Sequence, residues 1–366
     1  MSSIPSDHKY AHELKIATLA VKRASILTKS LGDSISVTRT SGSQIKDDKS
    51  PVTVGDYASQ ALINHALKLN FPQDEIVGEE DSDSLKDGSE EANRLSSKIL
   101  EILEDVQQKT VNWKSDIGEL KDLESVYTSI DLGNSEGGSK GRFWALDPID
   151  GTKGFLRGDQ FAVCLALIED GQVVLGVIGC PNLAEKVVSN TNMTGTKGGL
   201  YSAVKGLGAY YTPLFDTNEF VPLAKQEPIK MTQETSPSKL VVLEGVEKGH
   251  SSHSTQSQIK AHLGFSEETV QSQTINLDSQ AKYCVLAKGS ADIYLRLPIS
   301  DTYREKIWDH AAGNVLITES GGGVCDIEGK ELNFGNGRYL HSKGVIAANK
   351  AVLGRVISSV KAVVNK

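Results

Sequence analysis

Apolar residues near the start of the chain recur at intervals of three and four, the period of amphipathic helices. One such stripe runs through residues 14–31, and Gly32 is a typical helix stop. The polar stretch 33–50 predicts a mobile loop or hairpin. A second stripe predicts a helix that opens at Thr53 and ends before Pro72. The chain is therefore expected to begin with two helices joined by a loop.

Short apolar runs in the middle of the chain predict β-strands. Residues 161–168 and 173–178 are joined by Asp170-Gly171, a strong signal for a tight hairpin turn. A second hairpin is expected around Leu207, which lies between two glycines. This part of the chain is therefore expected to contain two β-hairpins.

A change of pattern divides the chain into two parts. With 366 residues it is too long for one simple core and suits two domains that share an interface. Residues 213–238 are rich in Pro, Thr and Gln, and beyond them strand and helix patterns alternate. We therefore predict an N-terminal α+β domain of residues 1–235 and a C-terminal α/β domain of residues 236–366.

The composition is that of an ordinary globular protein, with 39% hydrophobic and 23% charged residues. No apolar run approaches the length of a membrane span, and the N-terminus carries neither a signal-peptide nor a transit pattern. Four scattered cysteines without a Cys-x-x-Cys pair favour buried free thiols in a reducing compartment over disulfides or zinc. We expect a cytoplasmic protein without a membrane partner; the cysteines are Cys164, Cys180, Cys284 and Cys325.

The charge pattern limits the kinds of partner. The formal net charge is −8, and the basic residues are scattered rather than clustered. This argues against a nucleic-acid partner, whose phosphates need a basic patch. An acidic protein can still bind a small polyanion where metal ions neutralise it locally.

One segment concentrates oxygen ligands at the end of an apolar run. Asp147 and Asp150 lie three apart across a turn that a proline starts, so both carboxylates and the Ile149 carbonyl can face one point. Hard cations such as Mg²⁺ prefer such an all-oxygen surface. Gly151 and Thr152 add N–H groups and a hydroxyl where a phosphate can bind. The alternative is an ordinary Asp-Pro and Asp-Gly surface turn.

Other carboxylates lie at strand ends and helix starts. Asp56 has the spacing of a capping box with Thr53. Glu79 and Glu80 end a short strand, and Asp309 begins a helix. Each alone is explained as a cap or a solvated loop acid. Together with the two aspartates above, Asp56, Glu79 and Asp309 occupy places where open α/β structures put active sites. A phosphatase with two or three metal ions needs such a cluster to hold the cations and activate a water.

Four sequence blocks occur in a specific order: PVTVGD (51–56), VGEE (77–80), WALDPIDGT (144–152) and WDHAAG (308–313). Together they resemble the lithium-sensitive, magnesium-dependent phosphatase superfamily, which includes inositol monophosphatase and fructose-1,6-bisphosphatase. The resemblance spans nearly the whole chain. It implies an α+β or α/β fold, a layered αβαβα sandwich of the inositol monophosphatase type.

Three blocks in the C-terminal half narrow the resemblance: VEKGHSSH (246–253), LDSQAKYC (277–284) and DIYLRLP (292–298). They look like those of eukaryotic, and especially fungal, 3′(2′),5′-bisphosphate nucleotidases. These enzymes convert adenosine 3′,5′-bisphosphate (PAP) to AMP and phosphate and act on its sulfated analogue (PAPS). The family is linked to sulfur assimilation and to salt tolerance. The resemblance implies a small nucleotide substrate and inhibition by Li⁺ and Na⁺, and we expect a monomer.

By this resemblance the acidic cluster holds two or three Mg²⁺ ions. Carboxylates neutralise divalent ions, and a backbone oxygen adds a ligand without adding charge. Asp56 and Thr152 are implied to orient and deprotonate the attacking water, with Asp56 accepting the hydroxyl proton. In-line attack on the 3′-phosphate then needs no phosphoenzyme. The implied ligands are Glu79, Asp147, Asp150, Asp309 and the carbonyl of Ile149.

The resemblance also implies the residues that bind the substrate. The N–H groups of Gly151 and Thr152 would hold the scissile phosphate, and Asp309 belongs to the substrate contacts as well. His250 and Ser279 would form hydrogen bonds to the sugar or base.

Two basic residues are implied to grip the 5′-phosphate. Lys282 offers a charge and Arg296 a bidentate fork. A lysine on a helix face is usually solvated, however, and an arginine in a strand often makes a structural ion pair, so both alternatives stay open. His253 also competes with His250, because GHSSH offers two histidines.

The sequence separates the nucleotidase from three other functions to different degrees. The same acidic core would serve an inositol polyphosphate 1-phosphatase acting on inositol 1,4-bisphosphate, because only the contacts to the 5′-phosphate and base separate the two. A catalytically silent nucleotide sensor is disfavoured, since every implied ligand is present. A kinase is not indicated, because no GxxxxGK[ST] or HRD-type loop occurs.

Overall fold

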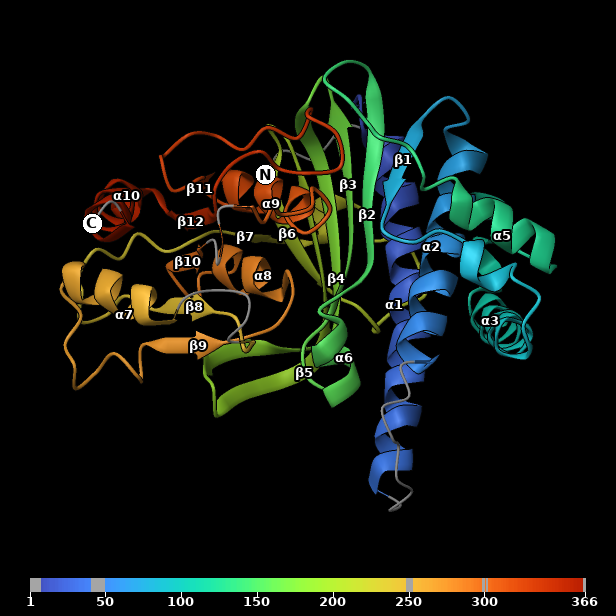
Figure 1. Cartoon of the computed structure of the whole chain (residues 1–366), viewed down its shortest axis with the longest axis horizontal. Helices are drawn as coiled ribbons and strands as arrows, with labels where there is room; N and C mark the ends of the chain where they lie inside the picture. Colours follow the sequence, from blue (N-terminus) through green and yellow to red (C-terminus); the bar gives the residue numbers. More distant parts are fainter. Residues whose placement is uncertain (1–7, 41–49, 248–252, 298–299, 301, 365–366) are drawn as a thin grey trace.

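A computed structural model describes residues 8–40, 50–247, 253–297, 300 and 302–364. Within them the chain folds into five layers, in which two β-sheets alternate with three layers of helices (Figure 1). This arrangement confirms the layered αβαβα sandwich expected from the sequence.

Two long helices form the outer layer beside the first sheet. Both helices pack on the sheet. None of the helices in the described part of the chain is long and apolar enough to cross a bilayer. The long helices are α1 (Ala11–Thr40) and α2 (Ser50–Asn70), and α2 is covered in turn by α3 (Glu90–Lys109), α4 (Lys114–Ile117) and α5 (Leu123–Asp131).

The first sheet has seven strands in chain order. The first two run parallel, and all later neighbours are antiparallel. The hairpin predicted at Asp170-Gly171 is confirmed, and both residues have the positive φ that such a turn requires. The hairpin around Leu207 is confirmed as well. The strands are β1 (Glu75–Gly78), β2 (Arg142–Asp150), β3 (Ala162–Glu169), β4 (Gln172–Ser189), β5 (Asn192–Val204), β6 (Gly208–Pro213) and β7 (Glu227–Ile229).

The second sheet lies on the other side of a central pair of helices, α8 (Ala281–Ala287) and α9 (Ala311–Glu319). Its five strands have the order β11-β12-β10-β8-β9, and two further helices cover its far face (Figure 1). These elements are β8 (Val242–Glu244), β9 (Thr274–Asn276), β10 (Ile293–Arg296), β11 (Gly322–Cys325) and β12 (Val345–Asn349), with α7 (His253–His262) and α10 (Lys350–Val364) outside.

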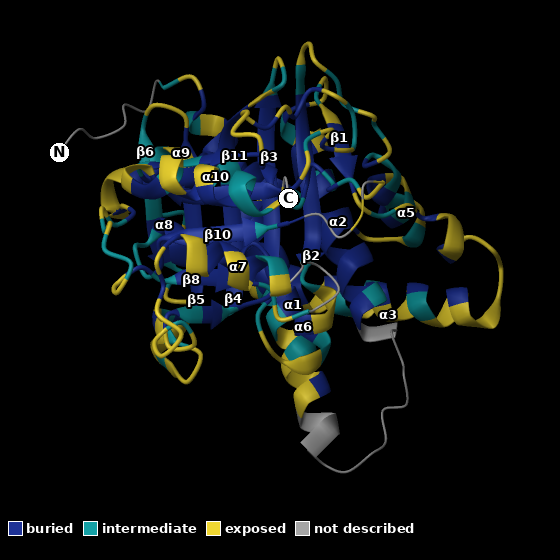
Figure 2. Cartoon of the chain, turned by 60° about the vertical axis from the view of Figure 1, so that its left-hand side comes forward, coloured by how far each residue is buried: buried dark blue, intermediate teal, exposed yellow. Residues whose placement is uncertain are grey.

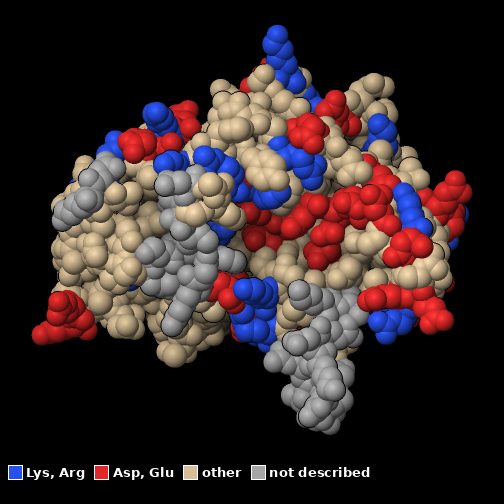
Figure 3. All heavy atoms as spheres, viewed as in Figure 1, with Lys and Arg blue, Asp and Glu red and all other residues tan. Residues whose placement is uncertain are grey.

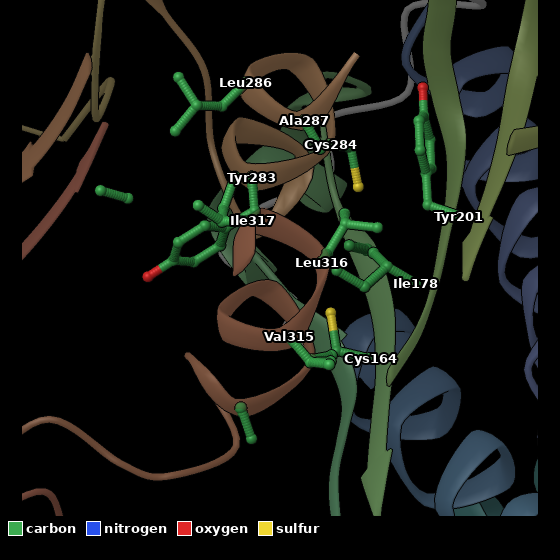
Figure 4. Close-up of a cluster of buried hydrophobic side chains, with 14 of the residues drawn as sticks. Cys164, Ile178, Tyr201, Tyr283, Cys284, Leu286, Ala287, Val315, Leu316 and Ile317 are labelled. Carbon is green, nitrogen blue, oxygen red and sulfur yellow. The ribbon is translucent and has the colours of Figure 1, made fainter. Parts of the chain in front are cut away.

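The central helices α8 and α9 lie between the two sheets, and most of their residues are buried. Figure 2 shows that the strands between the helix layers are mostly buried too. In Figure 4 side chains of α8 and α9 face residues of the first sheet such as Ile178 and Tyr201. The four cysteines are buried free thiols, as predicted, and the sulfur atoms of Cys180 and Cys284 lie 3.6 Å apart. The core therefore continues from one sheet through the helices to the other.

The end of α1 differs from the prediction. The helix continues past Gly32 to Thr40, so the predicted stop and the loop predicted for residues 33–40 are wrong. A Cβ at Gly32 would touch the Phe155 ring at 3.4 Å, so the glycine packs closely there. Glycine costs a helix only about 1 kcal/mol, which packing can outweigh. The rest of the predicted loop, residues 41–49, lies outside the described residues.

The start of α2 also differs. The helix begins at Ser50, so Thr53 and Asp56 lie within it and do not form the predicted capping box. Asp56 is almost fully buried, which a capping residue at a helix start would not require. Capping therefore does not explain why an aspartate is buried at position 56, and its neighbours inside the protein must be considered.

The chain passes from the first sheet to the second between Ile229 and Val242, close to the boundary predicted at residue 235. Apolar side chains from both sheets nevertheless share one core cluster. The division into two domains stays a prediction.

The packing of α8 on α9 is testable with matched glycine substitutions. A Cβ at Gly313 in α9 would lie 2.2 Å from the Tyr283 ring in α8, so Gly313→Ala should lower the free energy of unfolding by about 1–3 kcal/mol. Gly354 is exposed in α10, and a Cβ added there meets no described atom within 4 Å. Because alanine is favoured over glycine in a helix, Gly354→Ala should raise the free energy of unfolding by about 0.5–1 kcal/mol. Urea unfolding measures both, and a Gly313→Ala protein as stable as wild type would contradict the packing.

Candidate active site

Strand β2 ends in a β-bulge that turns Asp147 and Asp150 to the same side. Asp147 pairs with Cys164 and Asp150 with Ala162, so three steps along β2 match two along β3. Residues three apart in a regular strand point to opposite faces, and one extra residue brings them to the same face. The predicted proline-started turn is therefore wrong, because the segment is a bulged strand end. Both aspartates line one cavity, as the sequence led us to expect.

The chain turns sharply after the bulge and contacts the loop before α8. Gly151 has a φ of 88°, in the left-handed region that favours glycine. A Cβ at Gly151 would lie 2.9 Å from that of Ser279, so the two loops touch. The N–H of Gln280 donates to the carboxylate of Asp150. The bulge and the start of α6 (Thr152–Arg157) are thus fixed against α8.

Carboxylates from separate parts of the chain converge at this point. Glu79 directly follows β1, the parallel neighbour of β2. Asp309 lies just before α9, whose N-cap is His310, so the predicted capping role of Asp309 is wrong. Figure 3 shows acidic side chains across a hollow near the middle of this face, with basic ones above and below. The cavity has a volume of about 320 Å³, and its acidic lining comprises Glu79, Asp147, Asp150, Glu247, Asp278 and Asp309.

A buried glutamine ties helix α2 to the end of β1. Gln60 follows Asp56 by one helical turn, and its amide donates to the carbonyl of Glu80 at 2.6 Å and to that of Ile130 at 3.0 Å. Its Oε1 accepts from the N–H of Glu80 at 3.0 Å. These bonds hold the backbone beside Glu79, so the position of that carboxylate depends on α2.

Positive charge compensates the converging carboxylates only in part: Glu247 and Asp278 form ion pairs with Arg157, whereas the pKa values of Glu79 and Asp309 stay raised. Burial, followed by the charges of Glu80 and Asp150, raises the pKa of Glu79 to about 7, although this side chain is open to solvent on the cavity side. Burial and the charge of Asp150 likewise raise the pKa of Asp309 to about 7. Oδ1 of Asp147 is buried without a hydrogen-bond partner among the described atoms. A divalent cation with oxygen ligands fits this donor set.

Of the predicted catalytic pair, Thr152 lines the cavity, whereas Asp56 is buried and is not among the lining residues, and no hydrogen bond joins the two described side chains. Burial and the charges of Glu80 and Glu79 raise the pKa of Asp56 well above its usual range. Thr152 is exposed, and its hydroxyl donates to the carbonyl of Ile149 at 3.5 Å, a long hydrogen bond. The pairing of Asp56 with Thr152 stays a prediction.

Lys282 and Arg296 line the same cavity from α8 and β10. Lys282 is buried, its Nζ donates to the carbonyls of Leu277 at 3.1 Å and Ser279 at 2.7 Å, and burial lowers its pKa to about 8. The alternative of a solvated helix face is therefore wrong. Arg296 does make an ion pair, because its Nε lies 2.6 Å from Glu305, and it faces the cavity as well.

A buried network behind Arg296 was missed by sequence reasoning. Glu305 accepts from Arg296 and lies 3.4 Å from Nε2 of His310, whose Nδ1 lies 2.7 Å from the hydroxyl of Tyr283. Against the effect of burial, the hydrogen bonds from His310 and Arg296 lower the pKa of Glu305 to about 2. In the sequence, the sign of this network is the alternating charge of residues 304–306. An exposed loop can have the same pattern, so the pattern does not indicate a buried network.

The histidine assignments have a mixed outcome. His250 and the side chain of His253 lie outside the described residues, so the choice between them stays open. His310 is a histidine that the structure places in the cavity wall. Ligand atoms of Glu305, Asp309 and His310 lie within 4.8 Å of one another, but Glu305 is already bound to Arg296. Of these three groups, we therefore assign only Asp309 to the acidic site.

Comparison with known proteins agrees with this geometry. The sequence model of the inositol monophosphatase family matches residues 10–365. The chain belongs to the inositol monophosphatase family. The resemblance drawn from the sequence blocks is thereby confirmed for nearly the whole chain.

Relatives within the family share most of their length with this chain. The chain is 67% identical over 353 residues to 3′(2′),5′-bisphosphate nucleotidase 1 of Candida albicans, covering 96% of each protein. It is 45% identical to the 3′(2′),5′-bisphosphate nucleotidase of Emericella nidulans, covering 97% of this chain and 99% of the relative. The inositol monophosphatase of Zymomonas mobilis has a TM-score of 0.57 at 18% identity, covering 96% and 99% of the two chains, and shows the shared fold.

The raised pKa of Asp309 predicts how pH changes stability in metal-free buffer. The folded protein keeps this proton up to about pH 7, whereas an unfolded aspartate releases it near pH 4. The folded state therefore binds more protons in this window, and wild type should lose stability relative to Asp309→Asn as pH rises from about 4 to 7. One group contributes at most about 1.4 kcal/mol per pH unit. Urea titrations with EDTA measure the difference, and parallel pH profiles would contradict the assignment.

Proposed function

We propose that this family member is a Mg²⁺-dependent 3′(2′),5′-bisphosphate nucleotidase that hydrolyses the 3′-phosphate of PAP, giving AMP and phosphate, and also accepts PAPS. The observation that carries the proposal is the composition of the cavity, which has a carboxylate cluster at the end of β2 and two basic side chains, Lys282 and Arg296, in the same wall. A substrate with two phosphates suits such a cavity. The names of the relatives in Candida albicans and Emericella nidulans support the choice of nucleotide.

We assign the acidic part of the cavity to two or three Mg²⁺ ions. The unpartnered Oδ1 of Asp147 and the raised carboxylate pKa values support this assignment, because both reflect buried negative charge that the nearby basic groups do not fully offset. Bound Mg²⁺ polarises a phosphoryl group and acidifies water. The proposed ligands are Glu79, Asp147, Asp150, Asp309 and the carbonyl of Ile149.

The attacking water is assigned to Thr152 and Asp56. Thr152 is exposed at the cavity, and its long bond to the Ile149 carbonyl leaves the hydroxyl able to exchange partners and orient a water. Asp56 has a raised pKa, so it is a stronger base than a solvated aspartate once it is ionised. We assign it to take the proton, either from the Thr152 hydroxyl or from the water through it.

The two ends of the substrate are held by different groups. The N–H groups of Gly151 and Thr152, where α6 begins, are assigned to the scissile phosphate. Lys282 and Arg296 are assigned to the 5′-phosphate. Ser279 is assigned to the sugar or base. His250, which is outside the described residues, keeps the same assignment from the sequence resemblance.

Inhibition by Li⁺ and Na⁺ is part of the same proposal. A monovalent ion can occupy a Mg²⁺ position without supplying its charge, so activity at fixed Mg²⁺ should fall as LiCl is added. We also propose a cytoplasmic location, which the four buried free thiols support.

A comparison of two substrates tests the proposed activity. We expect kcat/KM for phosphate release from PAP to exceed that from inositol 1,4-bisphosphate by roughly 10-fold or more, because the inositol substrate has no base and carries its second phosphate at a different place from the 5′-phosphate of PAP, which leaves polar groups of the site without their partners. A higher kcat/KM for the inositol substrate would instead identify an inositol polyphosphate 1-phosphatase.

The sensor alternative is tested in the same assay. Asp56→Asn should lower kcat by at least about 100-fold with nearly unchanged affinity for PAP. The exposed Asp105→Asn in α3 is the matched control and should behave as wild type. Absence of turnover in wild type at saturating Mg²⁺ would favour a silent nucleotide sensor.

The role of Arg296 is tested with a substrate that lacks the 5′-phosphate. Charge-assisted hydrogen bonds contribute about 1.5–3 kcal/mol, so Arg296→Met should lower kcat/KM for PAP by roughly 10- to 100-fold. Activity on adenosine 3′-monophosphate should change much less and serves as the internal control for the loss of the Glu305 ion pair. Equal losses on both substrates would show that Arg296 acts through structure alone.

A further inference from the structure

Arg338 binds the backbone directly before Glu79. Its guanidinium donates to the carbonyl of Gly78 at 2.5 Å, to that of Gly133 at 3.2 Å and to that of Ser135 at 2.9 Å. The N–H of Gly78 donates in turn to the carbonyl of Gly133 at 2.8 Å. Three carbonyls from two neighbouring segments thus converge on one planar fork of donors, an arrangement that suits arginine.

The same guanidinium stacks on the residue directly before Asp309. Its Cζ lies 4.8 Å from the ring centre of Trp308, within the range of a cation–π contact. Trp308 is buried, and its carbonyl accepts from the side chain of Gln280 at 2.8 Å. The N–H of Ile307 donates to the carbonyl of Arg338 at 3.1 Å. The main chain of Arg338 is therefore hydrogen-bonded to the segment before Asp309, while its side chain is hydrogen-bonded to the segment before Glu79.

The two segments that Arg338 connects carry carboxylates that repel each other. The negative charge of Glu79 is among the causes, after burial and Asp150, that raise the pKa of Asp309. Arg338 is not among the residues that line the cavity. Its guanidinium instead contacts backbone carbonyls, such as that of Gly78, and the ring of Trp308. Its contacts oppose separation of the two segments without occupying the oxygens that face the cavity.

We propose that Arg338 is a positioning residue that fixes the spacing between Glu79 and Asp309, and that this spacing sets the affinity of the acidic site for Mg²⁺. The inference rests on the proposed function, in which both carboxylates are Mg²⁺ ligands. Residues that orient ligands from behind typically change metal affinity by 10- to 100-fold when they are replaced.

A competing explanation is that Arg338 acts only as a positive charge near the acids. Arg338→Lys separates the two explanations, because lysine keeps the charge but cannot bind three carbonyls with a planar fork. Arg355 offers a matched control. Its guanidinium also donates to two backbone carbonyls, of Thr235 at 2.8 Å and Leu263 at 3.1 Å, and it does not line the cavity.

Calorimetric titration of Mg²⁺ into the metal-free full-length protein is the deciding measurement. Circular dichroism verifies that each variant is folded at the temperature used. We expect Arg338→Lys and Arg338→Met to weaken Mg²⁺ binding by roughly 10-fold or more, and Arg355→Lys to bind as wild type. In the PAP assay, the Mg²⁺ concentration for half-maximal activity should rise by a similar factor, while kcat at saturating Mg²⁺ changes much less.

Each other outcome overturns a specific part of the proposal. Wild-type Mg²⁺ affinity in Arg338→Lys with weakened binding in Arg338→Met would show that charge alone matters. Wild-type affinity in both variants would remove Arg338 from the site altogether while leaving the proposed function intact. Absence of Mg²⁺ binding by wild type would overturn the proposed function, and this inference with it.

Discussion

Repulsion between like charges at the end of β2 is the constraint on which the rest of the structure depends. Carboxylates around one cavity cannot be held together by attraction to each other, so the fold holds several of them through the backbone of their segments. The bulge of β2 aligns two of them, Gln60 holds the backbone at Glu80, and Gln280 holds the carbonyl before Asp309. Because these contacts use main-chain groups, carboxylate oxygens remain available to a ligand.

The basic side chains of the cavity offset the acids only in part, because each also has partners of its own. The ammonium of Lys282 donates to two carbonyls of its own loop, and the guanidinium of Arg296 is paired with buried Glu305. Both lower the pKa of Asp150, although burial still raises it overall. Separate acidic and basic surfaces therefore coexist within about 320 Å³, which is the property that a substrate with two phosphates requires.

Local patterns predicted those features whose cause lies within a few residues. The hairpin at Asp170-Gly171 is confirmed because its turn needs left-handed backbone at two adjacent positions, which Asp-Gly readily adopts. Gly32 and Thr53 carry typical boundary signals, yet both lie inside helices. Such signals are each worth about 1 kcal/mol, less than the burial of one large apolar side chain against the sheet.

The sequence by itself determined the chemical inventory of the site: the order of the motifs, the oxygen ligands around Asp147 and the basic residues of the later blocks. Tertiary structure decided which of these groups are buried, how Arg296 is balanced by Glu305, and how Arg338 reaches Gly78, a residue 260 positions away. The reason is physical. Residue type and short spacing fix what a group can bind, whereas burial and contacts between distant segments arise only when the layers pack together.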